Sequence, residues 1–271
     1  MPLRMNLPET LRDRLASADR ALIGLWASAS SPVTAEIVAG SGCDWVLLDA
    51  EHSPNGLESV LAQLHAMSGY PVAPLVRVPF GDTVLIKQFL DLGAQNLLVP
   101  MVDSAEQAEQ IVRAVRYPPR GVRGVGSALA RSARWNRVDG YLGRADETIS
   151  LTVQIESAAA VADAERILAV DGVDAIFIGP SDLAASMGLL GQQNHPDVVA
   201  AVLTTIECAV AAGKPAGVNA FVPEDAERYI AAGASFVAVG ADVAILARQT
   251  EALVARFAAP ERGTRDARAS Y

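Results

Sequence analysis

Short apolar runs rich in β-branched residues alternate along the chain with longer segments whose apolar residues recur every three to four positions. The short runs are typical of strands buried on both faces, and the longer segments are typical of amphipathic helices. The predicted strands span 21–27, 45–50, 73–78, 96–101, 151–155, 175–179, 216–219 and 236–240. The predicted helices span 55–67, 82–92, 104–116, 158–168, 196–212, 223–232 and 244–257. Eight strands that alternate with helices predict a single-domain (β/α)8 TIM barrel.

An open, doubly wound sheet is the alternative fold. Such a sheet usually has fewer strands and carries a Gly-rich dinucleotide turn after its first strand, and no such turn follows Trp26. This pattern favours the barrel and gives no sign of a nucleotide cofactor. We expect the barrel domain to span residues 1–258, with an irregular Arg-rich and Gly-rich insertion at 118–148 and a charged, frayed tail at 259–271.

Composition narrows the class of protein and of partner. The chain has 271 residues, is 51% hydrophobic and carries a net charge of −9, and its basic residues are scattered. This distribution favours neither nucleic acid nor an anionic membrane surface as a partner. The sequence contains neither a secretory leader nor a membrane-length apolar run, so we expect a cytoplasmic location. Cys43 and Cys208 are expected to be reduced, buried thiols.

Polar side chains gather where the predicted strands end. In a barrel of this kind, chemistry takes place at the carboxyl ends of the strands. Five strands end in polar residues: Asp49, Glu51 and His52 after the second, Arg77 in the third, Gln154 and Glu156 in the fifth, Gly179, Pro180, Ser181 and Asp182 after the sixth, and Asn219 in the seventh. Charged groups in a barrel mouth are unstable unless they are paired or bind a ligand, so this clustering predicts a ligand site.

Glu156 and Asp182 follow neighbouring strands and can reach one ion. Two carboxylates that close repel each other, and a hard divalent cation removes the repulsion. Oxygen ligands with open coordination positions suit Mg²⁺ or Mn²⁺ better than a closed zinc site. The alternative is that one or both carboxylates cap the next helix or pair with an arginine.

Arg77 and His52 are the candidate partners of that site. Arg77 interrupts an apolar strand, where a guanidinium requires an anion, so it either pairs with a carboxylate, binds the substrate, or does each in a different state. A lone histidine is often structural. His52 is nevertheless the only histidine near the mouth, and Asp49 and Glu51 flank it and could fix its tautomer, so we interpret it as catalytic.

The lysines and cysteines do not suit covalent catalysis. Lys87 lies within a predicted helix, and Lys214 precedes the seventh strand at the opposite end of the barrel. Neither amine can form a Schiff base at the mouth, so a carbanion would need a metal for its stabilisation. The cysteines also lie away from the strand ends. The Gly-rich segment 121–126 resembles a phosphate loop but lacks the Gly-Lys-Ser/Thr of a P-loop.

Several motifs carry a resemblance to a known family. The motifs, in chain order, are LLDAEH, LVRVP, QNLLVPMV, RYPPRGVRGVGSALARSARWN, VQIES, VDAIFIGPSDLAASMG and FVAVG. Together they resemble the HpcH/HpaI aldolase family over about residues 22–257. The resemblance implies a metal-dependent class II aldolase that reversibly cleaves 4-hydroxy-2-oxo acids to pyruvate or hydroxypyruvate and an aldehyde.

The same resemblance implies roles for individual residues. A divalent Mg²⁺, Mn²⁺ or Co²⁺ ion would sit on Glu156 and Asp182, and Arg77 would stabilise the enolate oxygen. Gln154 and the backbone of Gly179, Pro180 and Ser181 would position the substrate. His52 would act as the base through a metal-bound water.

The resemblance also implies an assembly. Family members place an aspartate from a neighbouring subunit at the mouth, and Asp91 matches it here. We therefore expect a homo-hexamer, a dimer of trimers, whose last helix is exchanged between subunits. Whether Asp49 or the neighbour's Asp91 orients His52 stays open.

Two further residues complete the candidate substrate site. Asn219 stands where a close relative carries an aliphatic residue, which leaves open hydroxypyruvate as donor or a hydroxylated or sugar-derived aldehyde as acceptor. Trp26 ends the first strand and is counted as a substrate-binding candidate, with a role in the core or an interface as its alternative.

Three other functions remain as alternatives. The first is a phosphate-binding barrel isomerase, because the segment Gly240-Ala-Asp242 lies near the usual phosphate position of such barrels. An acyl-CoA lyase of the same superfamily would need a basic, adenine-sized groove, for which the sequence has no clear sign. A catalytically silent barrel is the third, because a fold alone does not establish activity.

Overall fold

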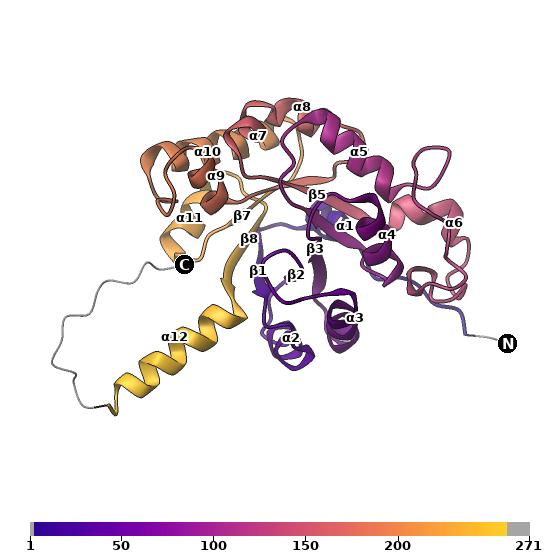
Figure 1. Ribbon diagram of the computed structural model, residues 1–271, viewed down its shortest axis with the longest axis horizontal. Helices are drawn as coiled ribbons and strands as arrows, with labels where there is room; N and C mark the ends of the chain where they lie inside the picture. The colour runs from indigo at the N-terminus through magenta and orange to yellow at the C-terminus, as the bar shows by residue number, and fades with distance from the viewer. Residues whose placement is uncertain (1–2, 259–271) are drawn as a thin grey trace.

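The computed structural model describes residues 3–258, and it contains a closed barrel of eight parallel strands (Figure 1). Each strand pairs with the next in sequence, and the last pairs with the first. The strands are β1 (Leu22–Ala27), β2 (Trp45–Asp49), β3 (Ala73–Arg77), β4 (Asn96–Val99), β5 (Ser150–Ile155), β6 (Ala175–Ile178), β7 (Ala216–Asn219) and β8 (Phe236–Ala241). The predicted (β/α)8 barrel is confirmed. The predicted tail at 259–271 lies outside the described residues.

One helix precedes the first strand, and the others follow the strands around the outside of the barrel. They are α1 (Leu11–Ser17), α2 (Pro32–Ala39), α3 (Leu57–Ala66), α4 (Thr83–Asp91), α5 (Ala105–Val115), α6 (Tyr141–Arg144), α7 (Ala158–Ala162), α8 (Ala164–Ala169), α9 (Pro180–Ser186), α10 (Pro196–Ala211), α11 (Pro223–Ala231) and α12 (Asp242–Ala255). The helix predicted at 158–168 is divided into α7 and α8 at Asp163. The predicted ranges also leave out α2 and α9, each of which begins at a proline, a residue that favours the first helical position.

Aromatic side chains fill the barrel interior. The ring of Trp45 lies with its centroid 6.2 Å from that of Phe177 and 5.6 Å from that of Phe236. Glycines make room for these rings: a Cβ at Gly24 would lie 2.1 Å from the Trp45 ring, and one at Gly217 would lie 2.5 Å from Phe236. The interior is therefore a packed core, and space for a ligand exists only at its ends.

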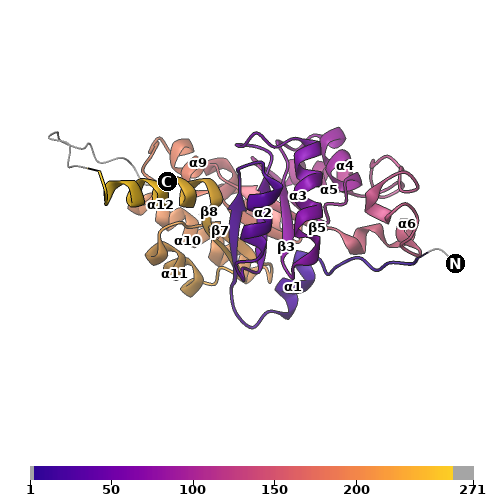
Figure 2. The same cartoon turned by 90° about the horizontal axis from the view of Figure 1, so that it is seen from below.

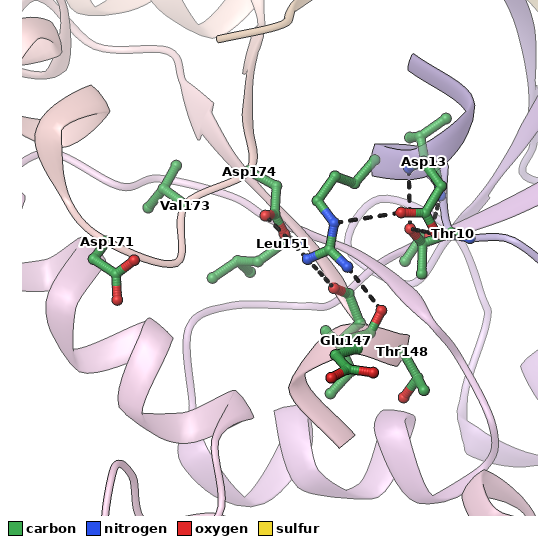
Figure 3. Close-up of polar contacts among 12 residues, drawn as sticks. Thr10, Asp13, Glu147, Thr148, Leu151, Asp171, Val173 and Asp174 are labelled. Carbon is green, nitrogen blue, oxygen red and sulfur yellow. Dashed lines mark hydrogen bonds and ion pairs between the residues drawn. The ribbon is translucent and has the colours of Figure 1, made fainter. Parts of the chain in front are cut away.

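Helix α1 closes the amino-terminal end of the barrel. Leu11 is fully buried, and its N–H donates to Oδ1 of Asn96 at 2.6 Å. Arg12 pairs with Asp174 at 3.4 Å and donates to the carbonyl of Glu147 at 2.7 Å (Figure 3). Lys214 lies away from the mouth, because its Nζ donates to the carbonyl oxygens of Val170 and Val173 before β6. The open end for chemistry is thus the carboxyl end of the strands.

Helix α12 projects away from the barrel (Figures 1 and 2). It contacts β1 and β8. Large apolar side chains are exposed along and just after it: Val243, Ile245, Leu246, Leu253, Val254 and Phe257.

Two smaller expectations can be compared with the structure. Cys43 and Cys208 are free thiols as predicted, but both are only partly buried rather than buried. None of the helices within residues 3–258 has both the length and the apolar character to cross a membrane.

Candidate active site

Side chains from neighbouring strands converge at the carboxyl end of the barrel. Asp49 ends β2, and Arg77, its partner in the strand register, ends β3. Gln154 lies in β5, and Glu156 follows that strand directly. All four side chains are almost fully buried, with residue exposures of 1–2%. The structure therefore brings these four predicted site residues to one mouth.

The Arg77 guanidinium is held on three sides. Its Nε lies 2.9 Å from Oδ1 of Asp49, and its Nη1 lies 2.8 Å from Oε2 of Glu51. Its Cζ lies 4.3 Å from the centroid of the Trp26 ring, a cation–π distance. Nη2 is buried and has no hydrogen-bond partner within residues 3–258. An unpaired buried donor is costly, so Nη2 is available for an anionic or carbonyl ligand.

Glu51 has a larger place in the site than the sequence suggested. The sequence places Glu51 only beside His52, whereas in the structure it is a direct ion-pair partner of Arg77. Burial raises the pKa of Glu51, while the charges of Arg77 and His52 act to lower it. The contact depends on how the chain turns after β2, which side-chain periodicity does not predict.

Glu156 is the most perturbed carboxyl group of the site. Burial, the largest cause, and the nearby charges of Glu51 and Asp182 together raise the pKa of Glu156 to about 7. Its Oε1 accepts a hydrogen bond of 2.8 Å from the N–H of Met101, and its Oε2 accepts one from the Gln154 amide. Met101 has a left-handed φ of 53°, which is strained for a non-glycine residue. This backbone donor was also missed from the sequence.

Asp182 completes a pair of carboxylates with Glu156. It lies in the first turn of α9 and is exposed to solvent. Gly179 allows the close approach of this turn, because a Cβ there would lie 2.7 Å from Oε2 of Glu156 and 2.9 Å from Nε2 of Gln154. Pro180 is buried and Ser181 is exposed, and both follow directly in the same turn.

These residues fit a divalent cation with an open coordination sphere. Within residues 3–258 there is no group of three or more His, Cys, Asp or Glu side chains arranged to hold a metal. A two-carboxylate site leaves several positions for water and substrate, which suits a hard cation bound through oxygen. Burial disfavours the ionised form of Glu156 and raises its pKa, and a bound cation would stabilise that form.

His52 stands at the solvent side of the mouth. Its side chain is 62% exposed, and its Nε2 lies 3.8 Å from Oε2 of Glu51. Asp49 accepts hydrogen bonds from the backbone N–H groups of Glu51 and His52, so it fixes the turn that carries the ring. The orientation of the His52 ring by Asp49 or by a neighbour's Asp91 stays a prediction.

Asp91 lies at the end of α4, away from the mouth of its own barrel. Its Oδ1 accepts a hydrogen bond of 3.0 Å from Nη2 of Arg123, whose side chain is fully buried. Arg123 also stacks on the Tyr117 ring, with Cζ 4.6 Å from the ring centroid. The insertion therefore holds Asp91 in place while about a quarter of its side chain remains exposed.

Three further polar atoms point to a ligand at the mouth. Nε1 of Trp26, Oε1 of Gln154 and Oδ1 of Asn219 are buried and have no hydrogen-bond partner in the described part of the chain. Trp26 also makes an edge contact with Phe221, with ring centroids 6.4 Å apart. Buried polar groups are rarely left unpaired, so three such atoms near the carboxyl ends of β1, β5 and β7 are typical of a binding site.

The segment Gly240-Ala-Asp242 is occupied from within the chain. Oδ1 of Asp242 accepts from the N–H groups of Ser28 and Val243, and its Oδ2 accepts from Ala29. A carboxylate thus fills the place where a phosphate would meet backbone donors. This contact argues against the phosphate-binding interpretation.

Comparison with known proteins agrees with this geometry. Residues 22–249 match the family model described as HpcH/HpaI aldolase/citrate lyase. The chain belongs to this family. A crystal structure of an HpcH/HpaI aldolase/citrate lyase family protein from Burkholderia cenocepacia J2315 is 39% identical, with a TM-score of 0.87, and the match covers 91% of this chain and 98% of that one.

Two relatives within the HpcH/HpaI family are more similar in sequence. A protein from Deinococcus radiodurans named hydroxypyruvate/pyruvate aldolase is 53% identical over 257 residues, which cover 94% of this chain and 92% of the relative. A protein from Shigella sonnei named 4-hydroxy-2-oxo-heptane-1,7-dioate aldolase is 51% identical over 242 residues, with 89% and 92% covered.

Proposed function

We propose that this protein is a metal-dependent class II aldolase, a carbon–carbon lyase that cleaves 4-hydroxy-2-oxo acids to pyruvate or hydroxypyruvate and an aldehyde. The observation that carries the proposal is the buried Glu156 carboxyl, close enough to Asp182 and Arg77 for their charges to act on it, together with Arg77 Nη2, which has no hydrogen-bond partner within residues 3–258. The names of relatives at 51–53% identity support the same reaction.

Glu156 and Asp182 are the residues that would hold the divalent cation, Mg²⁺, Mn²⁺ or Co²⁺. When bound, such a cation would supply electrostatic stabilisation for the negative charge that develops on the keto oxygen. In the cleavage direction, a base removes the proton of the C4 hydroxyl, the C4 oxygen forms the carbonyl bond of the released aldehyde, and the C3–C4 bond breaks. Its electron pair moves toward C3 and the C2 oxygen, and protonation of C3 yields the 2-oxo acid.

The chain's own residues supply the remaining roles in this proposal. Nη2 of Arg77 would donate to the enolate oxygen, and its fixed position removes the cost of reorganisation during the reaction. Gln154 and the Gly179–Ser181 turn would position the 2-oxo acid. The exposed His52 at the mouth would act as the base that removes the proton of the C4 hydroxyl in the cleavage direction.

We also propose that the active form is a homo-hexamer, a dimer of trimers with α12 exchanged between subunits. The exposed apolar side chains of α12, which projects from the barrel, support this assembly (Figure 2). Asp91 is held by Arg123 but lies away from its own mouth, so it would serve a neighbouring subunit.

Pyruvate release from a 4-hydroxy-2-oxo acid tests the reaction. A coupled lactate dehydrogenase assay should lose its signal when the protein is stripped with EDTA and regain it with Mg²⁺, Mn²⁺ or Co²⁺. Turnover that persists without any metal would contradict the proposed mechanism.

A further inference from the structure

The first residue of α12 is bound to the loop that follows β1. Asp242 is only 8% exposed, and its Oδ1 accepts hydrogen bonds from the N–H groups of Ser28 at 2.8 Å and Val243 at 2.7 Å. Its Oδ2 accepts a hydrogen bond of 3.1 Å from the N–H of Ala29. Hydrogen bonds to an ionised carboxylate are stronger than those between neutral groups. Asp242 thus ties the loop at residues 28–31 to the end of β8.

An irregularity between β1 and β8 places Asp242 beside this loop. Gly24 of β1 pairs with Ala238 of β8. Two residues later on β1, Trp26 pairs with Ala241, so β8 carries one extra residue between the two pairs. An extra residue of this kind changes the direction of the side chains that follow it, and such irregularities are frequent next to active sites. Asp242 comes directly after the register partner of Trp26.

The loop held by Asp242 is continuous with one wall of the mouth. Trp26 lies two residues before Ser28, and the centroid of its ring lies 4.3 Å from Cζ of Arg77. The Trp26 ring is the third of the three groups that hold this guanidinium. The position of the loop therefore sets the position of the ring, and the ring limits how the guanidinium can turn.

The other end of the loop contacts the turn after β2. Ser30 has a left-handed φ of 54°, which is strained for a non-glycine residue. Its Oγ donates to the carbonyl oxygen of Pro54 at 3.3 Å. Pro54 belongs to the turn that carries Glu51 and His52. The loop at 28–31 thus joins the start of α12 to two parts of the candidate active site.

Stabilisation of α12 explains only part of this arrangement. A carboxylate in the first turn of a helix interacts favourably with the helix dipole and with unpaired N–H groups there. The bond from Val243 serves that purpose. Ser28 and Ala29 lie 214 and 213 residues earlier in the chain, and the bonds from their N–H groups hold the loop instead.

We propose that Asp242 is a positioning residue for the aldolase reaction: it holds the loop at 28–31 and thereby sets the Trp26 ring against Arg77. The inference rests on the proposed function, in which Nη2 of Arg77 donates to the enolate oxygen. Loss of the Asp242 carboxylate should slow the reaction and leave the affinity for the cation unchanged, because its hydrogen bonds go to backbone groups outside the metal site.

Chemical rescue of Asp242→Ala tests this role. Exchange of the methyl protons of pyruvate in deuterated water, at saturating Mg²⁺, should slow about tenfold to 100-fold, the effect of a small displacement of a catalytic group. Added sodium formate supplies a carboxylate to the vacated N–H groups and should raise the rate several-fold, whereas sodium chloride should not. The affinity for Mn²⁺ in isothermal titration should match that of the wild type.

The Trp26 ring reports its own position without any reaction. In protein labelled with fluorotryptophan, Trp26→Phe identifies the fluorine resonance of Trp26 by removing it. This resonance should shift in metal-free Asp242→Ala and return when formate is added. Asp242→Asn keeps the shape of the side chain but only one accepting oxygen, so it should give intermediate values in both experiments, also if Asp242→Ala folds poorly.

Asp197→Ala is the matched control. Asp197 also lies in the first turn of a helix, α10, but its side chain is 74% exposed, and its removal should change neither the exchange rate nor the resonance of Trp26. Wild-type exchange in both Asp242 variants would overturn the proposal. Slower exchange with an unchanged Trp26 resonance, or with an equal loss of Mn²⁺ affinity, would also overturn it. If the wild type itself exchanges no protons, the proposed function fails, and an unmoved Trp26 resonance would separately refute the positioning by Asp242.

Discussion

Nε of Arg77 lies 2.9 Å from Oδ1 of Asp49, and both side chains are almost completely buried. This pair fixes one edge of the guanidinium, and Glu51 fixes a second nitrogen at 2.8 Å. Nη2 is buried and left without a hydrogen-bond partner in the described chain. The site is thus organised around one donor whose position is set before any ligand binds.

Replacement of Arg77 by lysine tests this organisation. The lysine ammonium keeps the positive charge. It cannot, however, contact Asp49 and Glu51, stack on Trp26 and donate to a substrate oxygen all at the same time. We expect Arg77→Lys to lower kcat about 100-fold, the usual effect of losing one stabilising donor. Arg20→Lys is the control, because Arg20 makes a surface pair with Asp44 before β1 and should keep its activity. An Arg77→Lys enzyme within a few-fold of wild type would show that the guanidinium is dispensable.

Gly179 provides a second test, aimed at the geometry around Glu156. A Cβ at this position would lie 2.7 Å from Oε2 of Glu156, so Gly179→Ala should displace that carboxylate. We expect metal affinity to fall about tenfold to 100-fold, measured by isothermal titration with Mn²⁺. Gly143→Ala serves as the control, because a Cβ there meets no atom within 4 Å. Equal affinity in the two variants would mean that Glu156 does not bind the metal from its present position.

The pH dependence of stability tests the burial of Glu156. Its pKa is raised from 4.5 to about 7, so the folded protein binds a proton that the unfolded chain releases. The metal-free protein should therefore be destabilised as the pH rises from 4.5 through 7, by about 2–3 kcal/mol. Glu156→Gln removes the ionisable carboxyl group and with it this pH-dependent loss of stability. The metal-free variant should therefore be more stable than the wild type at pH 8, but not at pH 4.5.

Urea unfolding in EDTA at the two pH values measures this difference. Addition of Mg²⁺ at pH 8 should restore stability to the wild type and leave Glu156→Gln unchanged, because only the ionised carboxylate binds the ion. The raised pKa would be contradicted if the free energies of unfolding of the wild type and of Glu156→Gln differed by the same amount at both pH values.

Much of the architecture could be predicted from the sequence. Strand runs such as 45–50 and 73–78 are short, apolar and separated by helical patterns, and these local signals set the barrel and the order of its strands. The same signals placed Asp49, Arg77, Gln154 and Glu156 at one end, because parallel strands in a barrel share their carboxyl ends.

The parts that were missed depend on loop geometry. The contact of Glu51 with Arg77 requires the particular turn after β2, and the donor to Glu156 is a backbone N–H of Met101, which carries no side-chain signal. In the sequence, Asp225 and Tyr229 have the spacing of ordinary residues of an amphipathic helix. Their approach to Asn219 exists only once the chain has folded.

The exposed face of α12 predicts an assembly that charge should disrupt. Leu246 is 60% exposed and Val254 is 64% exposed in the single chain. We expect Leu246→Glu and Val254→Glu together to convert the proposed hexamer into smaller species in light scattering after size exclusion. Gln249→Glu adds one charge at a polar exposed position of the same helix and should leave the assembly intact. A wild-type protein that elutes as a monomer would contradict the proposed exchange of α12.

The central claim is that Glu156 and Asp182 hold the cation that makes the methyl protons of pyruvate exchangeable. Exchange of those protons in deuterated water, followed by NMR without any aldehyde, measures this step alone. The account predicts exchange by the wild type with Mn²⁺, none after EDTA, and a loss of at least about 100-fold in Glu156→Ala and Asp182→Ala at matched metal concentration. Exchange that continues in EDTA, or at the wild-type rate in Glu156→Ala, would contradict it.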